Sequence, residues 1–308
     1  MAKSNNPIPA RIFDLARLFA LVLPRSLCLW KGRFLGRIVY WTDKKHRCRA
    51  LANLTTAFPT ELTEHERKII ARRSFTHFGE LFIDLVKLST MKPERMRRLI
   101  DFEGEEHLNR ALAQNRGALI ISAHFGNWEI APLLISRMAP LYVVARPLDN
   151  RPLEHRMISL REHFGARILY KQKASRHILR ALREKSMVAI LIDQNVLRDH
   201  AVFVDFFGKP AATTPGAATF HLRTGAPIVP VFSYPTPDHH YRIEIMPALQ
   251  FSPSDSDTRS VMNITQTCTD VIEAKIRRHP HLWLWFHDRW RSRPLSDPEA
   301  IAPGESED

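Results

Sequence analysis

Apolar positions along the first hundred residues recur with the period of an α-helix. One clear helix starts after Thr63, a suitable N-cap, with Glu66 at the capping-box position three residues later. Pro93 opens a second, short helix that ends near Ile100. The longer helix carries one apolar stripe suited to core packing, formed by Ile69, Ile70, Phe75, Phe78, Leu81, Phe82, Leu85 and Val86.

The pattern changes after Gly117, where short apolar runs replace the helical stripe. These runs cover 118–123, 141–145, 187–192, 228–233 and 241–246. Segments with helical periodicity lie between them at 127–138, 153–164, 175–184 and 214–224. Short buried strands that alternate with helices predict an α/β fold with a largely parallel central sheet flanked by helices. Such sheets place their functional residues at the carboxyl ends of the strands.

The segment before these elements is both apolar and basic. Residues 1–49 carry 11 Lys or Arg against two Asp or Glu, and residues 11–41 interleave these charges with Leu, Ile, Phe and Trp. This mixture is typical of a helix at an anionic membrane surface, and Pro24 interrupts it before it reaches the length of a clean span. We therefore expect residues 1–41 to form a helical membrane-associating anchor. The alternative is an amphipathic helix packed on its own domain.

Composition limits the remaining choices. The 308 residues are 44% hydrophobic and 25% charged, which suits one large globular domain, placed at 42–295. The acidic, Pro-containing stretch 296–308 is expected to be a flexible tail. Three cysteines form neither a disulfide framework nor a zinc cluster. The net charge of +13 comes almost wholly from the first hundred residues, but no nucleic-acid motif accompanies it, so no nucleic-acid partner is expected.

The candidate chemistry lies directly after the first predicted strand. His124 is suited to act as a base near neutral pH, and Glu129 is expected to fold back onto it from the first turn of the next helix. Gly126 permits a tight turn and Asn127 is a suitable N-cap. Such a pair fits deprotonation of a substrate hydroxyl; the alternative is a histidine that only packs in the loop. The segment reads Ser122-Ala123-His124-Phe125-Gly126-Asn127-Trp128-Glu129.

Four blocks, in order, resemble motifs of the bacterial lipid A biosynthesis late acyltransferases, the lauroyl and myristoyl transferases. The segment just given resembles their H-x4-D/E box. The others are Ala145–Asn150 with Leu153-Glu154, resembling R-P-x-x-N-x-x-x-[DE]; Asp193-Gln194-Asn195 with Val202–Thr214, resembling D-Q … V-x-F-F-G-x-P-A-x-T; and His279-Pro280 with Trp283–Pro294, resembling the closing H-P … W-x-H-R-R-x-K-x-R-P block. The similarity spans roughly residues 10–295.

The resemblance implies an enzyme that moves a fatty acyl chain to a hydroxyl of a lipid A precursor or related glycolipid. The donor is an acyl-carrier thioester, with acyl carrier protein as the expected carrier. The implied location is the cytoplasmic face of the cell inner membrane, held peripherally or by the single N-terminal anchor. No metal and no cofactor are implied, because the thioester is already activated. Acyl carrier proteins are acidic, so a basic rim on this enzyme is expected to assist docking.

The resemblance also assigns roles to single residues. His124 becomes the general base and Glu129 the catalytic carboxylate. Arg146 is the expected oxyanion or phosphate partner, with a solvated arginine as the alternative. Asp193 forms part of the site wall or caps a helix, and Arg289 belongs to a headgroup rim or to a packed C-terminal element. The expected substrate-binding set is Asn127, Arg146, Asp193, Gln194 and Arg289.

Several alternatives stay open. Relatives with the same box act on phosphatidylinositol mannosides or lysophospholipids. A hydrolase, in which His124 activates water, would cleave lipid esters or thioesters. A basic, non-enzymatic scaffold would function without His124. Aromatic side chains of the third block either line an acyl slot or belong to the core; these are Phe203, Phe206 and Phe207.

Overall fold

The computed structural model describes residues 4–170, 174–251 and 258–295, so the predicted tail at 296–308 lies outside the described residues. Five helices come first: α1 (Ile8–Val22), α2 (Arg25–Thr42), α3 (Lys44–Ala57), α4 (Glu64–Leu88) and α5 (Pro93–Arg97). Helix α4 begins at the predicted capping box, with the Thr63 and Glu66 side chains each bonded to the other's backbone N–H. The predicted start of this helix is therefore confirmed.

Seven strands form one central sheet, in the order β1-β9-β8-β2-β5-β3-β4. Every neighbouring pair is parallel except β8 and β9, which are antiparallel. The predicted largely parallel sheet is confirmed. Its strands are β1 (Ile100–Glu103), β2 (Ala118–Ser122), β3 (Leu141–Ala145), β4 (Ala166–Tyr170), β5 (Met187–Leu191), β8 (Ile228–Pro235) and β9 (Tyr241–Ile245). A separate hairpin pairs β6 (Val202–Phe206) with β7 (Lys209–Thr213).

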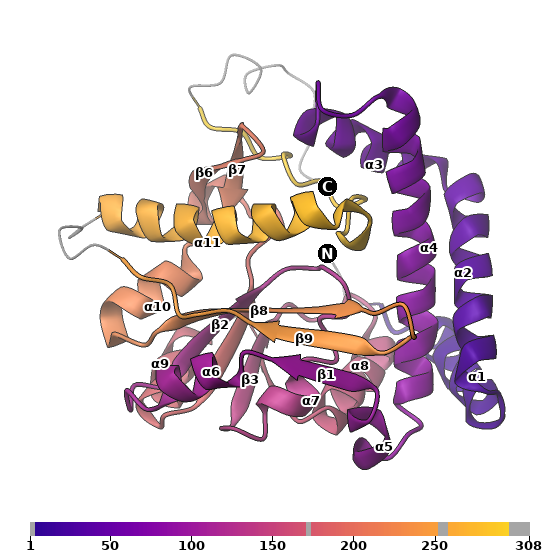
Figure 1. Ribbon diagram of the computed structural model, residues 1–308, viewed down its shortest axis with the longest axis horizontal. Helices are drawn as coiled ribbons and strands as arrows, with labels where there is room; N and C mark the ends of the chain where they lie inside the picture. Colours follow the sequence, from indigo (N-terminus) through magenta and orange to yellow (C-terminus); the bar gives the residue numbers. More distant parts are fainter. Residues whose placement is uncertain (1–3, 171–173, 252–257, 296–308) are drawn as a thin grey trace.

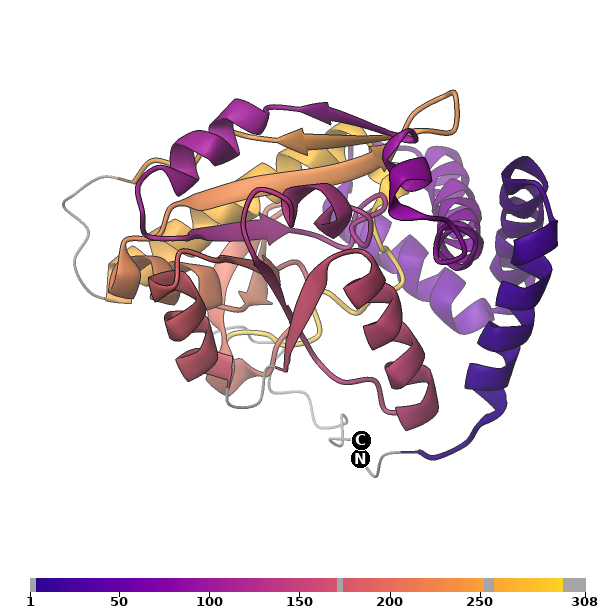
Figure 2. The same ribbon diagram turned by 90° about the horizontal axis from the view of Figure 1, so that it is seen from below.

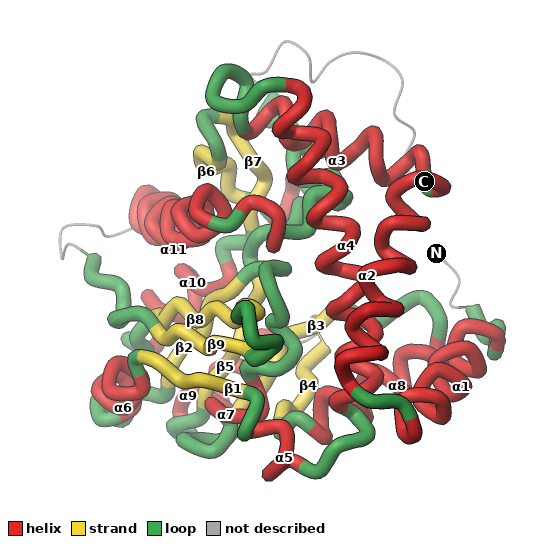
Figure 3. The backbone as a smooth tube through the Cα atoms, turned by 45° about the vertical axis from the view of Figure 1, so that its right-hand side comes forward, coloured by secondary structure: helices red, strands yellow, loops and turns green. Residues whose placement is uncertain are grey.

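Helices cover both faces of the sheet (Figures 1 and 3). Successive residues of β2 alternate between two apolar clusters, with Leu119 in one and Ile120 in the other. The first cluster includes α9 (Ala174–Arg183), α10 (Gly216–Thr224) and α11 (Thr258–Arg278), and the second includes α6 (Glu105–Leu112), α7 (Pro132–Ile135) and α8 (Arg151–His163). Two short 3-10 turns, η1 (Arg198–His200) and η2 (Pro280–Leu282), complete the described elements.

Helix α2 lies along α4 at backbone contact (Figure 1). A Cβ on Gly32 would lie 2.7 Å from the Glu80 Cα, and one on Gly36 would lie 2.3 Å from the Phe75 carbonyl oxygen. Only glycine permits so close an approach of two helices. Among the described residues, none of the helices combines the length with the apolar character that a membrane span requires.

The N-terminal segment is also tied to the loop that follows β3. The backbone N–H of Ser4 donates to the Asp149 carbonyl over 2.7 Å, and the Arg151 N–H donates to the Ser4 carbonyl over 3.0 Å. Arg156 of α8 forms a two-pronged ion pair with Asp14 of α1. Figure 2 shows α1 beside the sheet domain at this edge. The N-terminal helices are therefore packed on the sheet domain and also expose an outer surface.

The predicted helix at 127–138 is wrong, since only Pro132–Ile135 is helical. The loop donors find partners in distant segments: the Gly126 N–H donates to the Leu282 carbonyl and the Asn127 N–H to the Ser233 carbonyl, both over 2.9 Å. These bonds replace the i to i−4 bonds of a helix. The loop is thereby fixed between β8 and η2.

Candidate active site

The strand register brings His124 and Asp193 together. β2 and β5 are parallel neighbours in which Ser122 pairs with Leu191. His124 and Asp193 each follow two residues later, so they emerge opposite each other at the carboxyl edge of the sheet. The Asp193 Oδ1 accepts from the His124 Nδ1 over 2.9 Å, and its Oδ2 accepts from the His124 backbone N–H over 2.8 Å.

A third donor completes the surroundings of Asp193. The Trp283 indole N–H donates to Oδ2 over 2.8 Å, and the carboxylate is buried. Burial by itself would raise the pKa of Asp193, but the facing His124 and the hydrogen bonds from His124 and Trp283 outweigh it and lower the pKa below its ordinary value. The carboxylate therefore stays ionised and accepts the Nδ1 proton.

This arrangement selects one tautomer of His124. With the proton on Nδ1, the lone pair lies on Nε2, which is 3.3 Å from the Gln194 amide nitrogen. The His124 side chain is 21% exposed and its ring lies against Trp128 at a centroid distance of 5.1 Å. In this tautomer Nε2 accepts only the long hydrogen bond from the Gln194 amide, which a substrate hydroxyl could replace, so Nε2 is suited to accept a proton from that hydroxyl.

The expected contact between Glu129 and His124 is absent, and this part of the prediction is wrong. Glu129 lies in a turn, where its carboxylate accepts from Arg161 of α8, with Nε to Oε2 at 3.0 Å and Nη2 to Oε1 at 2.7 Å. Both side chains are largely buried. Glu129 thus joins the His124 loop to α8, while Asp193, expected to line the site wall, is the carboxylate on the imidazole.

The closing block carries Trp283 into the site and buries Arg289. The Arg289 guanidinium is closed off from solvent and donates to the Ala212 carbonyl over 2.6 Å and to the Thr213 hydroxyl. Burial lowers the pKa of Arg289 to about 10. The expectation that Arg289 contacts a headgroup is therefore not met, and the alternative of a packed element holds. The neighbouring His287 accepts from the Asn195 N–H over 3.0 Å, and burial lowers its pKa to about 4.

The remaining predicted residues divide between rim and core. Arg146 follows β3, and its side chain is 77% exposed and 3.7 Å from Asp149. Gln194 lies directly at Nε2, whereas Asn127 is fully buried. Phe206 and Phe207 belong to the apolar core, as the second interpretation of these aromatics had it.

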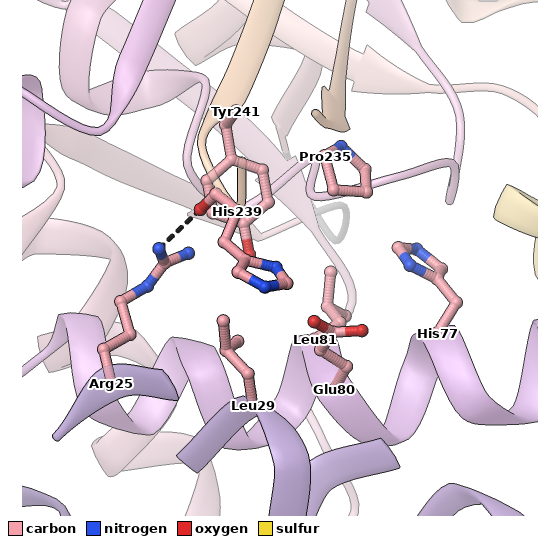
Figure 4. A pocket seen from close by; sticks show the side chains of 8 residues that line it. All are labelled: Arg25, Leu29, His77, Glu80, Leu81, Pro235, His239 and Tyr241. Carbon is pink, nitrogen blue, oxygen red and sulfur yellow. Dashed lines mark hydrogen bonds between the residues drawn. The ribbon is translucent and has the colours of Figure 1, made fainter. Parts of the chain in front are cut away.

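Figure 4 shows a pocket whose lining residues do not include His124. It is lined by α2, α4 and the β8–β9 hairpin and has a volume of about 20 Å³, enough for about one water molecule. Arg25 lines it and donates to Asp84 over 2.8 and 2.6 Å, while the Tyr241 hydroxyl donates to the same carboxylate over 2.6 Å. These bonds hold α2 to α4 and to the sheet.

Across residues 4–170, 174–251 and 258–295, no three His, Cys, Asp or Glu side chains gather as metal ligands would. The chemistry that these residues support is proton transfer at Nε2 of His124, assisted by a buried carboxylate at the carboxyl edge of a parallel sheet. Such a site is typical of an enzyme that activates a hydroxyl group.

The family model of bacterial lipid A biosynthesis acyltransferases matches residues 12–292. The chain belongs to this family and is an acyltransferase.

Known relatives show the range of this family. The lipid A biosynthesis palmitoleoyltransferase of Escherichia coli K12 is 28% identical, over 89% of this chain and 88% of the relative. The myristoyltransferase of the same organism is 24% identical, over 90% and 83%. A phosphatidylinositol mannoside acyltransferase of Mycobacterium tuberculosis H37Rv is 29% identical, over 70% and 69%. A solved 1-acyl-sn-glycerophosphate acyltransferase of Thermotoga maritima is similar at a TM-score of 0.37 and 13% identity, over 80% and 97%.

Proposed function

We propose that this protein transfers a fatty acyl chain from an acyl carrier protein thioester to a hydroxyl of a lipid A precursor or related glycolipid. The observation that carries the proposal is the geometry of His124, whose Nδ1 is held by Asp193 and whose Nε2 is left as an acceptor. The names of the two Escherichia coli relatives support the acceptor.

The proposed reaction has two steps. Nε2 of His124 takes the proton of the acceptor hydroxyl as its oxygen attacks the thioester carbonyl carbon. The tetrahedral intermediate then collapses, the carbon–sulfur bond breaks, and the imidazolium returns the proton to the departing thiolate. Asp193 orients the imidazole and stabilises its charge. Arg146 and Gln194 are the proposed contacts for the oxyanion or for a headgroup phosphate, because Gln194 lies at Nε2 and Arg146 is exposed directly after β3, the strand beside β5.

The second part of the proposal concerns the membrane. Residues 1–41 would contact the bilayer and residues 42–295 would hold the catalytic domain, at the cytoplasmic face of the inner membrane. The support is an apolar outer surface on α1 and α2, where Trp30 is 58% and Trp41 69% exposed. Arg11, Arg17 and Lys31 are exposed on the same two helices and would meet anionic headgroups.

A direct assay tests the transfer. Purified protein is given a radiolabelled acyl carrier protein thioester with and without a glycolipid acceptor. We expect label in the acceptor with the wild type, none with His124→Ala, and an undiminished rate with His155→Ala, an exposed histidine of α8. Transfer by His124→Ala would refute the base assignment. Release of free fatty acid at a rate that ignores the acceptor would identify a hydrolase instead.

The acceptor has a second candidate, because the Mycobacterium tuberculosis relative is a phosphatidylinositol mannoside acyltransferase. Mass spectrometry of lipids from cells with and without the protein distinguishes the two. A mass difference of one acyl group on lipid A supports the first acceptor, and the same difference on a phosphatidylinositol mannoside or another phospholipid replaces it.

A further inference from the structure

The exposed basic side chains of α3 do not share the character of the membrane-facing helices. Lys44 and Lys45 follow each other at the start of α3, and both are exposed. Neither forms an ion pair with any described residue. On α1 and α2 the basic residues alternate with exposed Phe, Trp, Leu and Ile, but none of the large exposed apolar residues lies on α3. A surface with charge and no apolar side chains suits a soluble acidic partner better than a bilayer interior.

Helix α3 contacts the closing block, which also supplies Trp283 to the candidate site. Arg49 of α3 forms an ion pair with Asp288, and the Asn53 side chain donates to the Trp285 and His287 carbonyls over 2.6 and 2.7 Å. Figure 1 shows the C-terminal segment passing beneath α3. Positive charge on α3 is thus held beside the segment that supplies Trp283 to the site.

The same segment joins α3 to the loop after β5. The Asn195 side chain donates to the Ser292 hydroxyl over 3.1 Å, and the Ser292 N–H donates back to the Asn195 amide oxygen over 3.1 Å. Arg291, which precedes Ser292, and Arg198, three residues after Asn195, are both exposed. Leu197, directly before Arg198, adds an apolar side chain that is 69% exposed.

Together these side chains form what we call the basic rim: Lys44, Lys45, Arg49, Arg198 and Arg291. The acidic residues in or next to these segments are Asp43, Asp199 and Asp288, so the five basic side chains of the rim still leave it a net positive charge. A rim of one sign with an exposed leucine has the composition of a transient protein interface, in which charge steers the encounter.

We propose that the basic rim docks the acidic carrier protein that delivers the acyl thioester. The inference rests on the proposed function, because it names the surface that the donor of that reaction would use. The carrier would sit across α3 and the 285–292 segment, with its thioester arm directed past Gln194 to His124. The outer surface of α1 and α2 would remain free for lipid, so donor protein and membrane would not compete for one surface.

The experiment compares two donors that carry the same acyl group. One is the acyl carrier protein thioester and the other is the corresponding pantetheine thioester, which has no protein, each tested over several chain lengths with one glycolipid acceptor. For the double variant Lys44→Glu/Lys45→Glu, we expect kcat/KM with the carrier protein to fall by about tenfold or more. The value with pantetheine thioester should stay within about twofold, since only rim charge has changed. Added salt should lower the wild-type rate with the carrier and affect the variant less.

A matched control reverses two exposed charges on other elements, Lys92→Glu/Arg110→Glu, before α5 and on α6. It should leave both donors unchanged. An equal fall with both donors, or carrier kinetics that do not change, would overturn the docking surface. A variant that loses binding to anionic vesicles while its carrier kinetics stay normal would assign the rim to lipid and also overturn it. Absence of transfer by the wild type from either donor would instead overturn the proposed function.

Discussion

Replacing Asp193 by asparagine tests which carboxylate serves His124. Three N–H donors converge on Asp193: two from His124 and one from Trp283, at 2.8 to 2.9 Å. A carboxylate accepts all three, but an amide has one oxygen and one NH2 group. If the amide oxygen keeps the Trp283 and backbone donors, its NH2 faces Nδ1, which must then lose its proton. The proton moves to Nε2, and the base is lost.

The magnitude follows from the groups left unpaired. If the amide turns the other way, its NH2 faces the His124 backbone N–H and the Trp283 indole N–H. Each of these buried donors is then unpaired, which lowers the free energy of unfolding by about 1–3 kcal/mol. In either orientation the negative charge that stabilises the imidazolium is lost as well. We expect turnover to fall by roughly 10³ to 10⁴, which corresponds to about 4–5.5 kcal/mol of transition-state stabilisation. The fold should persist, because the amide has almost the same shape and retains some of the hydrogen bonds.

The assay is steady-state transfer of labelled acyl groups, normalised to folded protein by near-ultraviolet circular dichroism. Glu129→Gln is the matched comparison, since it makes the same chemical change in a carboxylate that contacts Arg161 and not His124. It should lower the free energy of unfolding by about 3–5 kcal/mol, because it leaves Arg161 without its charge partner, yet lower turnover per folded molecule by less than tenfold. If Glu129→Gln lost the larger factor while Asp193→Asn stayed active, the reasoning would be refuted.

Three further predictions concern stability, each read from reversible urea denaturation. Asp84→Ala should lower the free energy of unfolding by about 3–5 kcal/mol, because Arg25 is left largely buried without its partner. Tyr241→Phe removes only one hydrogen bond to the Asp84 carboxylate and should lower it by about 1.5–3 kcal/mol. Equal losses for the two variants would contradict this. Gly36→Leu should cost at least about 3 kcal/mol by forcing α2 from α4, and a stable, active variant would disprove the close contact. Burial lowers the pKa of His77 to about 4, so from pH 6.5 down to about 4 the unfolded chain binds a proton that the folded chain does not. The free energy of unfolding should therefore fall on acidification, by up to about 1.36 kcal/mol per pH unit. His77→Gln should flatten this pH dependence, and an unchanged slope would assign it to another group.

The elements that the sequence predicted well are those whose signals are local. The capping box of α4, the apolar runs of the strands and the helices α8, α9 and α10 each follow from residues close together in the chain. The segment 127–138 differs because its backbone donors are taken by Leu282 and Ser233, which are distant in sequence. Helical periodicity does not reveal such tertiary bonds.

The candidate site shows the same contrast between local signals and contacts distant in sequence. His124 was found because it comes directly after a buried strand. The sequence predicts its carboxylate five residues away at Glu129, but the contact is made by Asp193, in the loop after the neighbouring strand β5. The pairing of Ser122 with Leu191 decides this contact, and strand register is not visible in one sequence. The closing block predicts Arg289 at a headgroup rim or in a packed element, and the structure shows the second: its Nη1 and Nη2 donate to the Ala212 carbonyl and the Thr213 hydroxyl inside the core.

Because Trp283 lies near the end of the described chain, the surroundings of Asp193 are completed late in protein synthesis. Ribosomes synthesise α1 and α2 first, then the strand that leads to His124, and only much later the tryptophan that completes the hydrogen bonds of Asp193. Until the ribosome has released Trp283, the Asp193 carboxylate lacks its third hydrogen-bond donor. The full set of hydrogen bonds on Asp193 therefore forms only after nearly the whole described chain has emerged from the ribosome.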